Sequence, residues 1–234
     1  MSDKSIISLA ETAGPLLAID SSSDQAGLAL FDGASIAELS WPAARTQTAT
    51  LLAEIQHMLT LRGFGPGDLA AVAVATGPGS FTGVRVALSV AKGLALGLRI
   101  PTIGVPTLAA AALPHLGPWQ TVIPVVAAGR GRLLWAVYGP AGGEPGQSPR
   151  LVAGPRNGTF AELREACRDT GPGAVVTGEL TTQNEHLLVA DGSRVAAAAL
   201  RHRRPAAVAL LGWQRFVAGD TDDPATLDQI YLAP

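Results

Sequence analysis

The chain has 234 residues, 47% of them hydrophobic and 15% charged, so it is long enough for one large domain or two modest domains and too apolar to be disordered as a whole. Its formal net charge of −2 argues against a general basic surface that would hold nucleic acid. Its single cysteine, Cys167, excludes an intrachain disulfide framework and favours a reducing compartment, and the charged helix-like segment around it favours a structural thiol over a catalytic one.

The first 112 residues predict a β-rich start followed by alternating helices and strands. Residues 1–15 lack a long apolar core and a cleavage site, so we interpret them as a loose extension. Three antiparallel strands, a helix, a parallel strand and a second helix are then predicted over Leu16–Asp20, Ala26–Phe31, Ser35–Ser40, Ala43–Arg62, Leu69–Ala75 and residues 83–98. This order of elements is that of a ribonuclease-H-like half domain.

From residue 100 the chain repeats strands and helices in weaker form. The elements predicted there cover Leu108–Leu113, Val122–Ala128, Leu133–Tyr138, Phe160–Arg168, Ala174–Val176 and Pro205–Ala218. We therefore predict an α/β protein of two duplicated halves, a domain over residues 16–112 and a smaller one over 113–234, whose last helix is free to pack back on the first domain. No run of about 18 apolar residues is uninterrupted by proline or charge, so a soluble, cytoplasmic protein without a membrane span is expected.

A glycine-rich loop, residues 77–83, joins the predicted strand at 69–75 to the helix behind it. The N-terminus of that helix, with Ser80 or Thr82 as its N-cap, offers backbone N–H groups to an anion. The loop lacks the lysine of a P-loop, because Val84 follows its last glycine, and it misses the dinucleotide-binding spacing by one residue. A phosphate cradle and a sharp turn that permits close packing both stay open, with the turn favoured.

The helix after the loop carries two apolar stripes. Small side chains recur at four-residue spacing and form one stripe, at Gly83, Ala87, Ala91 and Ala95. Larger side chains form the other, at Val86, Val90, Leu94 and Leu98. A helix that is apolar on nearly every side is buried on nearly every side, so we expect one face on the chain's own sheet and the small stripe against a second helix. That second helix belongs either to this chain or to a partner protein.

Three stretches carry a resemblance to a known family: LLAIDSSSDQAGLALFDG, TLLAEIQHML and ATGPGSFTGVRVALSVAKGLALGLRIPTIGVPTL. From about Leu16 to Ala112 the chain resembles the TsaB family, also called YeaZ, within the actin-like superfold of sugar kinases and Hsp70. The resemblance implies a noncatalytic subunit that pairs with TsaD, the related catalytic protein, in bacterial synthesis of the threonylcarbamoyl modification on the tRNA adenosine beside the anticodon. It also implies that the ATPase TsaE acts through this pair, that TsaC supplies threonylcarbamoyl-adenylate, that the chain can form a homodimer without TsaD, and that tRNA contact is indirect.

The resemblance also implies two sets of site residues. Partner-binding residues are expected on the helix pair, at Gln47, Leu51, Met58, Gly83, Ala87, Val90, Ala91, Leu94 and Ala95. A vestigial nucleotide site is expected at Asp20, Ser22, Gly77, Gly79, Ser80, Thr82 and Gly83. Kinases of the superfold keep glycine after the first-strand aspartate, and TsaD-like catalysts keep a histidine pair four residues apart on one helix. Here serines fill positions 21–23, and Gln47, Thr50 and His57 supply no such pair, so we expect no metal, no cofactor, weak or absent ATP binding, and no enzyme activity of the chain alone.

Several alternatives stay open beside this interpretation. A residual nucleotide hydrolase or glycoprotease-like peptidase would use Asp20 and the loop at 77–83, although no set of nucleophile, base and orienting group can be assigned. The histidines outside the helix pair are expected at the surface or in loops, at His115, His186 and His202. Five arginines could meet RNA phosphates, although a solvated basic face is favoured, at Arg130, Arg132, Arg201, Arg203 and Arg204. The second half departs from the family's usual residues at Ala127, Gly129, Arg132 and Ala233, which weakens inferences about its contacts.

Overall fold

A computed structural model of the chain describes residues 14–42, 47–118, 120–139 and 148–232. The chain divides into two compact units: unit 1 has residues 1–106 and 204–230, and unit 2 has residues 107–203 and 231–234. The first boundary lies after residue 106 rather than after 112, because the helix α4 (Thr107–Ala112) packs on the strands of unit 2. The last helix, α7 (Pro205–Val217), belongs to unit 1.

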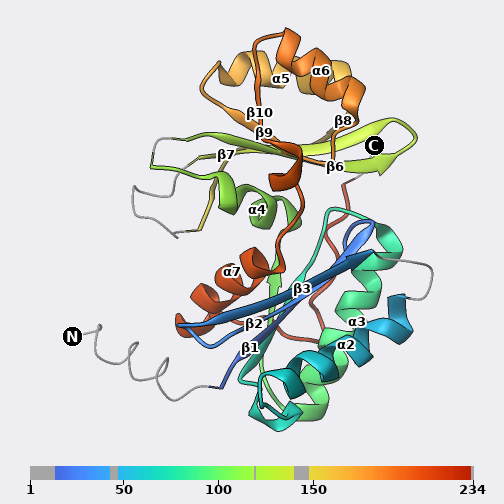
Figure 1. Cartoon of the computed structure of the whole chain (residues 1–234), viewed down its shortest axis with the longest axis vertical. Coiled ribbons are helices and arrows are strands. Elements are labelled where there is room, and N and C mark those ends of the chain that lie inside the picture. The colour runs from blue at the N-terminus through green and yellow to red at the C-terminus, as the bar shows by residue number, and fades with distance from the viewer. Residues whose placement is uncertain (1–13, 43–46, 119, 140–147, 233–234) are drawn as a thin grey trace. The chain divides into compact units, whose positions relative to one another are not determined.

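Unit 1 is a five-stranded mixed sheet with helices on both faces (Figure 1). Its other elements are β1 (Leu16–Asp20), β2 (Gln25–Phe31), β3 (Ile36–Pro42), α2 (Gln47–Leu61), a 3₁₀ turn (Pro66–Asp68), β4 (Ala71–Ala75), α3 (Phe81–Leu98) and β5 (Thr102–Val105). In the strand order β3-β2-β1-β4-β5, the first three strands form an antiparallel meander, and β4 and β5 run parallel to β1. This arrangement is the ribonuclease-H-like half that the predicted order of elements indicates.

The alternation of side chains along the strands of unit 1 assigns each face of the sheet to different helices. Leu17 and Ile19 of β1 point to one face and join the core formed with α2 and α3. On the opposite face, small side chains of β4 let α7 approach closely. A Cβ atom on Gly212 of α7 would lie 2.5 Å from the Cβ of Ala73 in β4. Close packing of small residues therefore occurs between α7 and the sheet.

Unit 2 repeats the same topology. Its remaining elements are β6 (Val122–Gly129), β7 (Arg132–Gly139), β8 (Arg150–Gly158), α5 (Phe160–Thr170), β9 (Val175–Gly178), α6 (Thr182–Ala190), β10 (Arg194–Val195) and 3₁₀ turns at Leu113–His115 and Ala198–Leu200. In the order β10-β9-β6-β7-β8, the meander β6-β7-β8 is antiparallel, and β9 and β10 run parallel to β6. Helices α5 and α6 cover one face of this sheet and α4 the other (Figure 1). The predicted class, two duplicated halves of mixed sheet with helices, is confirmed.

Strand β8, helix α6 and the two-residue strand β10 of unit 2 were absent from the sequence prediction. Strand β8 is an edge strand whose side chains from Arg150 to Arg156 are all exposed, so it lacks the alternation of a half-buried strand. Helix α6 contains one fully buried side chain, Leu188, and its polar residues follow no helical period. Only tertiary contacts distinguish these two segments from loops.

Helix α3 is, within the part of the chain that the structure describes, the one helix long and apolar enough to cross a membrane by length and composition. The core helix of a soluble protein passes the same test, and 33% of this segment is buried inside the chain. This single helix is therefore weak evidence of a membrane span.

Candidate functional site

The turn after β1 is stabilised by hydrogen bonds between its own residues. Asp20, at the end of β1, is 4% exposed, and its Oδ1 accepts hydrogen bonds from the backbone N–H of Ser22 at 2.8 Å and from the Ser22 hydroxyl at 2.5 Å. Ser21 donates its hydroxyl hydrogen to the carbonyl oxygen of Gly83 at 2.7 Å. The Asp20 carboxylate therefore stabilises the turn that follows it, and Ser21 of that turn hydrogen-bonds to the first turn of α3.

The loop at 77–83 packs directly against this turn. The backbone N–H of Ser80 donates to the carbonyl of Ser22 at 2.8 Å. A Cβ atom on Gly79 would lie 2.2 Å from the Ser22 carbonyl oxygen, and one on Gly83 would lie 1.9 Å from the carbonyl oxygen of Ser21. Both glycines are therefore required because two backbones touch here. We call this contact, between residues 20–23 and 77–83, the loop junction.

Ser80 is the N-cap of α3, and its hydroxyl accepts from the backbone N–H of Gly83 at 3.3 Å. Thr82, the other predicted cap, lies inside the first turn of the helix with an exposed side chain. The structure thus brings together every residue predicted for the vestigial nucleotide site except Thr82, whose side chain is exposed on the first turn of α3. Gly79 and Gly83 permit a close approach between the backbone of the loop at 77–83 and the backbone of the turn after β1.

The C-terminal segment of unit 1 runs along the edge strand β5 and reaches the end of β4. Ile230 donates its backbone N–H to the carbonyl of Thr76 at 2.7 Å, just before the loop at 77–83. The carboxylate of Asp222 accepts from the backbone N–H of Gly104 at 2.7 Å and pairs with Arg215 at 3.0 Å. Open α/β sheets bind ligands beyond the carboxyl ends of their parallel strands. In unit 1 Ile230 lies at that end of β4.

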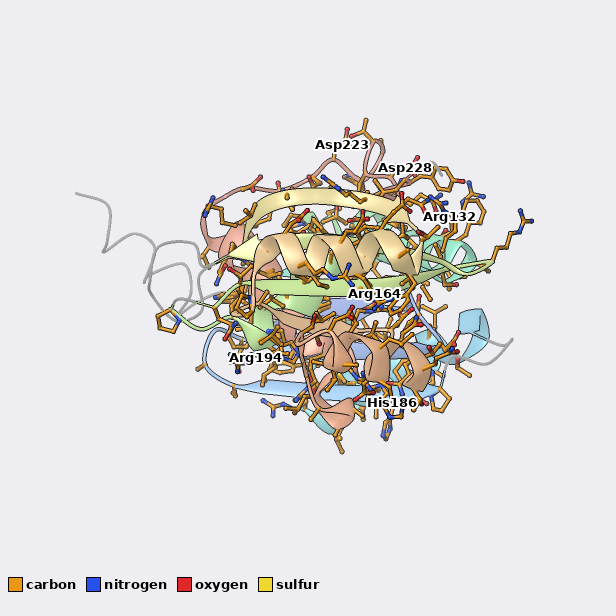
Figure 2. The ribbon with its side chains drawn as sticks, turned by 90° about the horizontal axis from the view of Figure 1, so that it is seen from above. Arg132, Arg164, His186, Arg194, Asp223 and Asp228 are labelled. Atoms are coloured by element: carbon orange, nitrogen blue, oxygen red, sulfur yellow. The ribbon has the colours of Figure 1, made fainter. Side chains whose placement is uncertain are left out.

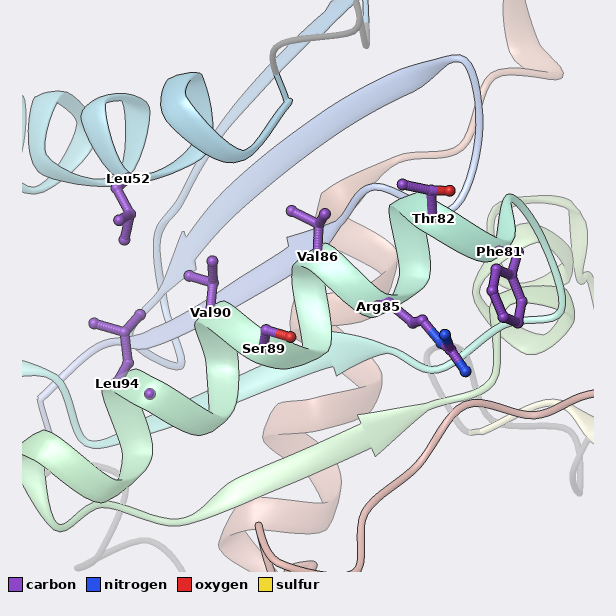
Figure 3. Close-up of a pocket in the computed structure, with 9 residues that line it drawn as sticks. Leu52, Phe81, Thr82, Arg85, Val86, Ser89, Val90 and Leu94 are labelled. Atoms are coloured by element: carbon purple, nitrogen blue, oxygen red, sulfur yellow. The ribbon is translucent and has the colours of Figure 1, made fainter.

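A second feature of unit 1 is an apolar groove of about 610 Å³ between α2 and α3 (Figure 3). We call it the α2–α3 groove; it is lined by Leu52, Phe81, Thr82, Arg85, Val86, Ser89, Val90, Gly93 and Leu94. Leu52 of α2 points toward the row of apolar side chains on α3 in Figure 3. Leu52 is 53% exposed and Phe81 50% exposed. At the N-terminal end of α3 the guanidinium of Arg85 lies over the Phe81 ring, 3.9 Å from its centre, and forms a cation–π contact with it.

The partner surface predicted from the sequence requires a correction. The stripe Gly83, Ala87, Ala91 and Ala95 is buried within unit 1, as are Leu51 and Met58. The small side chains let α3 lie close to its own sheet, so they are not a contact surface for a second molecule. Of the predicted partner-binding residues, Val90 and Leu94 line the α2–α3 groove. The side chain of Gln47 lies outside the described residues.

Sequence reasoning missed Leu52, Phe81, Arg85, Ser89 and Gly93, which line the exposed side of α3 and α2. A signal for them is present in the sequence. Gly93 sits in the middle of a long helix, where glycine costs about 1 kcal/mol relative to alanine, so it needs a reason other than helix formation. An exposed helical glycine with no atom within 4 Å of an added Cβ leaves room for a neighbour.

Two titratable side chains of unit 2, His115 and Cys167, are partly or fully buried among other residues of that unit. His115 is half-buried rather than fully at the surface: its Nε2 lies 2.8 Å from the Thr177 hydroxyl and 3.1 Å from the carbonyl oxygen of Leu200, and burial lowers its pKa. In the described ranges, no group of three or more His, Cys, Asp or Glu side chains is placed to hold a metal ion. Cys167 lines a cavity of about 220 Å³ with Arg168 and Asp191.

We expect the Cys167 thiol to react slowly with alkylating reagents. Burial raises its pKa to about 11. At pH 8 the thiolate, which is the reactive form, is then on the order of 100-fold less populated than in an ordinary cysteine, and reactivity rises with pH up to the raised pKa. Mass spectrometry of iodoacetamide-treated protein would measure this rate. Labelling of the native chain as fast as that of the urea-unfolded chain would contradict it.

Two ribonuclease-H-like halves, with the loop at 77–83 between β4 and α3, define a protein of the actin-like superfold. Proteins of similar sequence indicate one family within this superfold. The chain is 36% identical over 128 residues to the tRNA threonylcarbamoyladenosine biosynthesis protein TsaB of Escherichia coli, which covers 53% of this chain and 54% of that protein. It is 27% identical over 207 residues to TsaB of Bacillus subtilis, which covers 87% of this chain and 89% of that protein. These relatives support the TsaB family, also called YeaZ, which the sequence motifs resemble.

Other comparisons agree with this family. The solved structure of YeaZ from Pseudomonas aeruginosa has a TM-score of 0.73 at 22% identity, over 94% of this chain and 100% of that chain, and so shares the fold. The family model of TsaD, the tRNA N6-adenosine threonylcarbamoyltransferase, matches residues 42–147. The chain spans about half the length of the curated relatives from Escherichia coli and Haemophilus influenzae, at 54% and 41%.

Proposed function

We propose that the chain is a noncatalytic subunit that binds a TsaD transferase through the α2–α3 groove and supports threonylcarbamoyl transfer to the tRNA adenosine beside the anticodon. The observation that carries this proposal is the groove itself, where apolar side chains of α2 and α3 stay exposed beside a well-packed core. A contiguous apolar groove of this kind on a soluble chain is typical of a protein contact.

The match to the TsaD family model supports the choice of partner. It covers residues 42–147, which include α2 and α3. A transferase that resembles this chain over that stretch presents a similar helix pair, and two such pairs can pack as four helices. The same geometry accommodates a second copy of this chain, so we include a homodimer in the absence of TsaD. We further propose a cytoplasmic location and action of TsaE through the TsaB–TsaD pair.

The loop junction supports a noncatalytic role. A nucleotide held by an actin-like half needs space between the turn after β1 and the loop after β4. Here the Ser80 N–H and the Ser22 carbonyl are bonded at 2.8 Å across that space. We therefore propose that no nucleotide binds at this junction, and we find no observation among the described residues that favours the hydrolase or peptidase alternative.

The proposal predicts that the chain restores tRNA modification. A reaction with tRNA, TsaE, the TsaC system that supplies threonylcarbamoyl-adenylate, and a TsaD of the same organism should yield modified adenosine only when this chain is added. Mass spectrometry of the digested tRNA nucleosides measures the product. Equal product without the chain, or no product with it while the E. coli TsaB–TsaD pair is active in parallel, would rule the proposal out.

A further inference from the structure

Of the five arginines predicted as possible phosphate contacts, some form ion pairs with carboxylates and others do not. Three of them are paired: Arg201 with Glu185 at 2.7 Å, Arg203 with Glu179 at 2.7 Å, and Arg204 with Glu38. A guanidinium beside a carboxylate is largely neutralised and attracts a phosphate less strongly. Arg130 and Arg132 differ, because neither forms an ion pair with any residue that the structure describes.

Arg130 occupies the tip of the β6–β7 hairpin. It is exposed, and its φ of 52° lies between those of Gly129 at 74° and Gly131 at 75°. This run of left-handed backbone makes a tight tip that carries Arg130 beyond the last cross-strand pair of the hairpin, Gly129 and Arg132. A Cβ atom on either glycine would meet no atom within 4 Å, so open space surrounds the tip.

Arg132 and Arg156 lie at the same end of the meander. Arg132 reaches across to β8, where its Nε donates to the Asn157 side-chain oxygen at 2.8 Å and its Nη2 donates to the Asn157 carbonyl at 2.6 Å. These two bonds fix the guanidinium in one orientation. Arg156 is the residue next to Asn157 on β8 and is exposed. The Arg132 guanidinium is therefore held by two hydrogen bonds to Asn157, and Arg156 is the exposed neighbour of Asn157 along the strand.

Glu162 is the carboxylate near these two arginines. Hydrogen bonds from the backbone and hydroxyl of Thr159 hold the pKa of Glu162 below its ordinary value, with smaller electrostatic contributions from Arg132 and Arg156. The carboxylate serves as the capping partner of α5, since its Oε2 accepts from the Thr159 N–H at 2.6 Å and from its hydroxyl at 2.8 Å. A second carboxylate, Glu179, accepts a hydrogen bond from the Ala127 N–H at 2.9 Å beside the hairpin end, but it is already paired with Arg203 at 2.7 Å. Two carboxylates thus lie near the three arginines, and one of them is in an ion pair elsewhere.

We propose that Arg130, Arg132 and Arg156 form a contact surface for the phosphate backbone of RNA. Residues 107–143 contain no Asp or Glu, so strands β6 and β7 themselves contribute no carboxylate to this surface. Guanidinium groups suit phosphate because their fork of N–H donors matches its oxygens. The tip, Ala127 to Gly131, has no large apolar side chain to insert into a membrane. The choice of RNA rests on the proposed function, whereas the surface lies in unit 2 and the α2–α3 groove in unit 1.

The test measures binding of fluorescein-labelled unmodified tRNA to the full chain by fluorescence anisotropy over a salt series. The triple variant Arg130→Gln, Arg132→Gln, Arg156→Gln should weaken binding on the order of tenfold or more and reduce the slope of log affinity against log salt by about 2 to 3, since each lost phosphate contact removes about 1. Arg194→Gln is the matched control. It removes one exposed arginine of unit 2 on the side away from Arg132 (Figure 2), and it should change affinity less than twofold.

Arg130→Gln alone tests the surface with little effect on the fold, because its side chain is exposed at the hairpin tip; it should lower the slope by about 1. Wild-type chain that binds no tRNA, or a triple variant with the affinity and salt slope of Arg194→Gln, overturns the proposal. So does tighter binding of the wild type to phosphatidylserine vesicles than to tRNA. Co-purification of the triple variant with TsaD separates this proposal from the proposed function, because it should stay unchanged.

Discussion

Gly83→Ala is expected to destabilise the folded chain by about 3 kcal/mol, although alanine is the better helix former by about 1 kcal/mol. The added Cβ would lie 1.9 Å from the carbonyl oxygen of Ser21, a backbone atom that cannot move without displacing the turn after β1. That displacement breaks the bond from the Ser21 hydroxyl to the Gly83 carbonyl and the bond from Ser80 to Ser22, each contributing about 1 kcal/mol. Urea unfolding followed by circular dichroism measures the loss.

Gly93→Ala is the matched control for this change. It lies on the same helix, and its added Cβ would meet no atom within 4 Å, so only helix propensity changes. We expect it to stabilise the chain by about 0.5 to 1 kcal/mol. Opposite signs for the two glycines would establish that the loop junction, rather than helix formation, requires glycine at 83. A Gly83→Ala chain as stable as the wild type would contradict the contact.

Leu52→Asp is expected to weaken binding to TsaD about thirtyfold, equivalent to about 2 kcal/mol, the size of an interface hot spot. Leu52 faces the apolar row of α3 across the α2–α3 groove and is 53% exposed, so the substitution places a charge in the proposed interface and leaves the core intact. Isothermal titration calorimetry with purified TsaD measures the change.

Leu61→Asp provides the comparison on the same helix. Leu61 is 76% exposed and lies outside the groove, so the same chemical change there should alter affinity less than twofold. Both variants should melt within a few degrees of the wild type, because neither side chain is buried. Equal effects of the two substitutions on TsaD binding would place the interface elsewhere. In contrast, Ala87→Leu would overpack the core, since Ala87 is fully buried, and would report on stability rather than on partner binding.

Part of the candidate site could be predicted from the sequence because it follows from strand order. Asp20 ends β1 and the loop at 77–83 follows β4, and the two strands are parallel neighbours, so their carboxyl ends meet at one edge of the sheet. This parallel pairing of β1 and β4 is sufficient to predict that Asp20 lies near the glycines of the loop at 77–83. Whether a ligand or the chain's own backbone fills the space between them depends on distances of a few tenths of an ångström, which no pattern of residue types encodes.

The partner surface could not be predicted for a related reason. The helical spacing of the residues distinguishes the small stripe of α3 from the stripe of larger apolar side chains. This periodicity identifies the faces of the helix, but it does not show which face packs against the sheet. The structure places Ala87 and Ala91 inward and leaves Phe81 and Ser89 outward. Small residues do mark a close approach in this chain, but it is the approach of α3 to its own sheet.

The sequence by itself determined the meander, the order of helices and strands in unit 1 and the resemblance to the TsaB family, because these depend on local periodicity, turn residues and motifs that are contiguous in the chain. It left Ser80 and Thr82 as alternative N-caps of α3, and the structure selects Ser80. The tertiary structure alone decided which face of α3 is exposed, that the loop junction is closed, that β8 is a strand, and which arginines remain outside ion pairs with described residues. Those properties arise from contacts between segments far apart in the sequence, whose energies depend on packing distance and not on spacing along the chain.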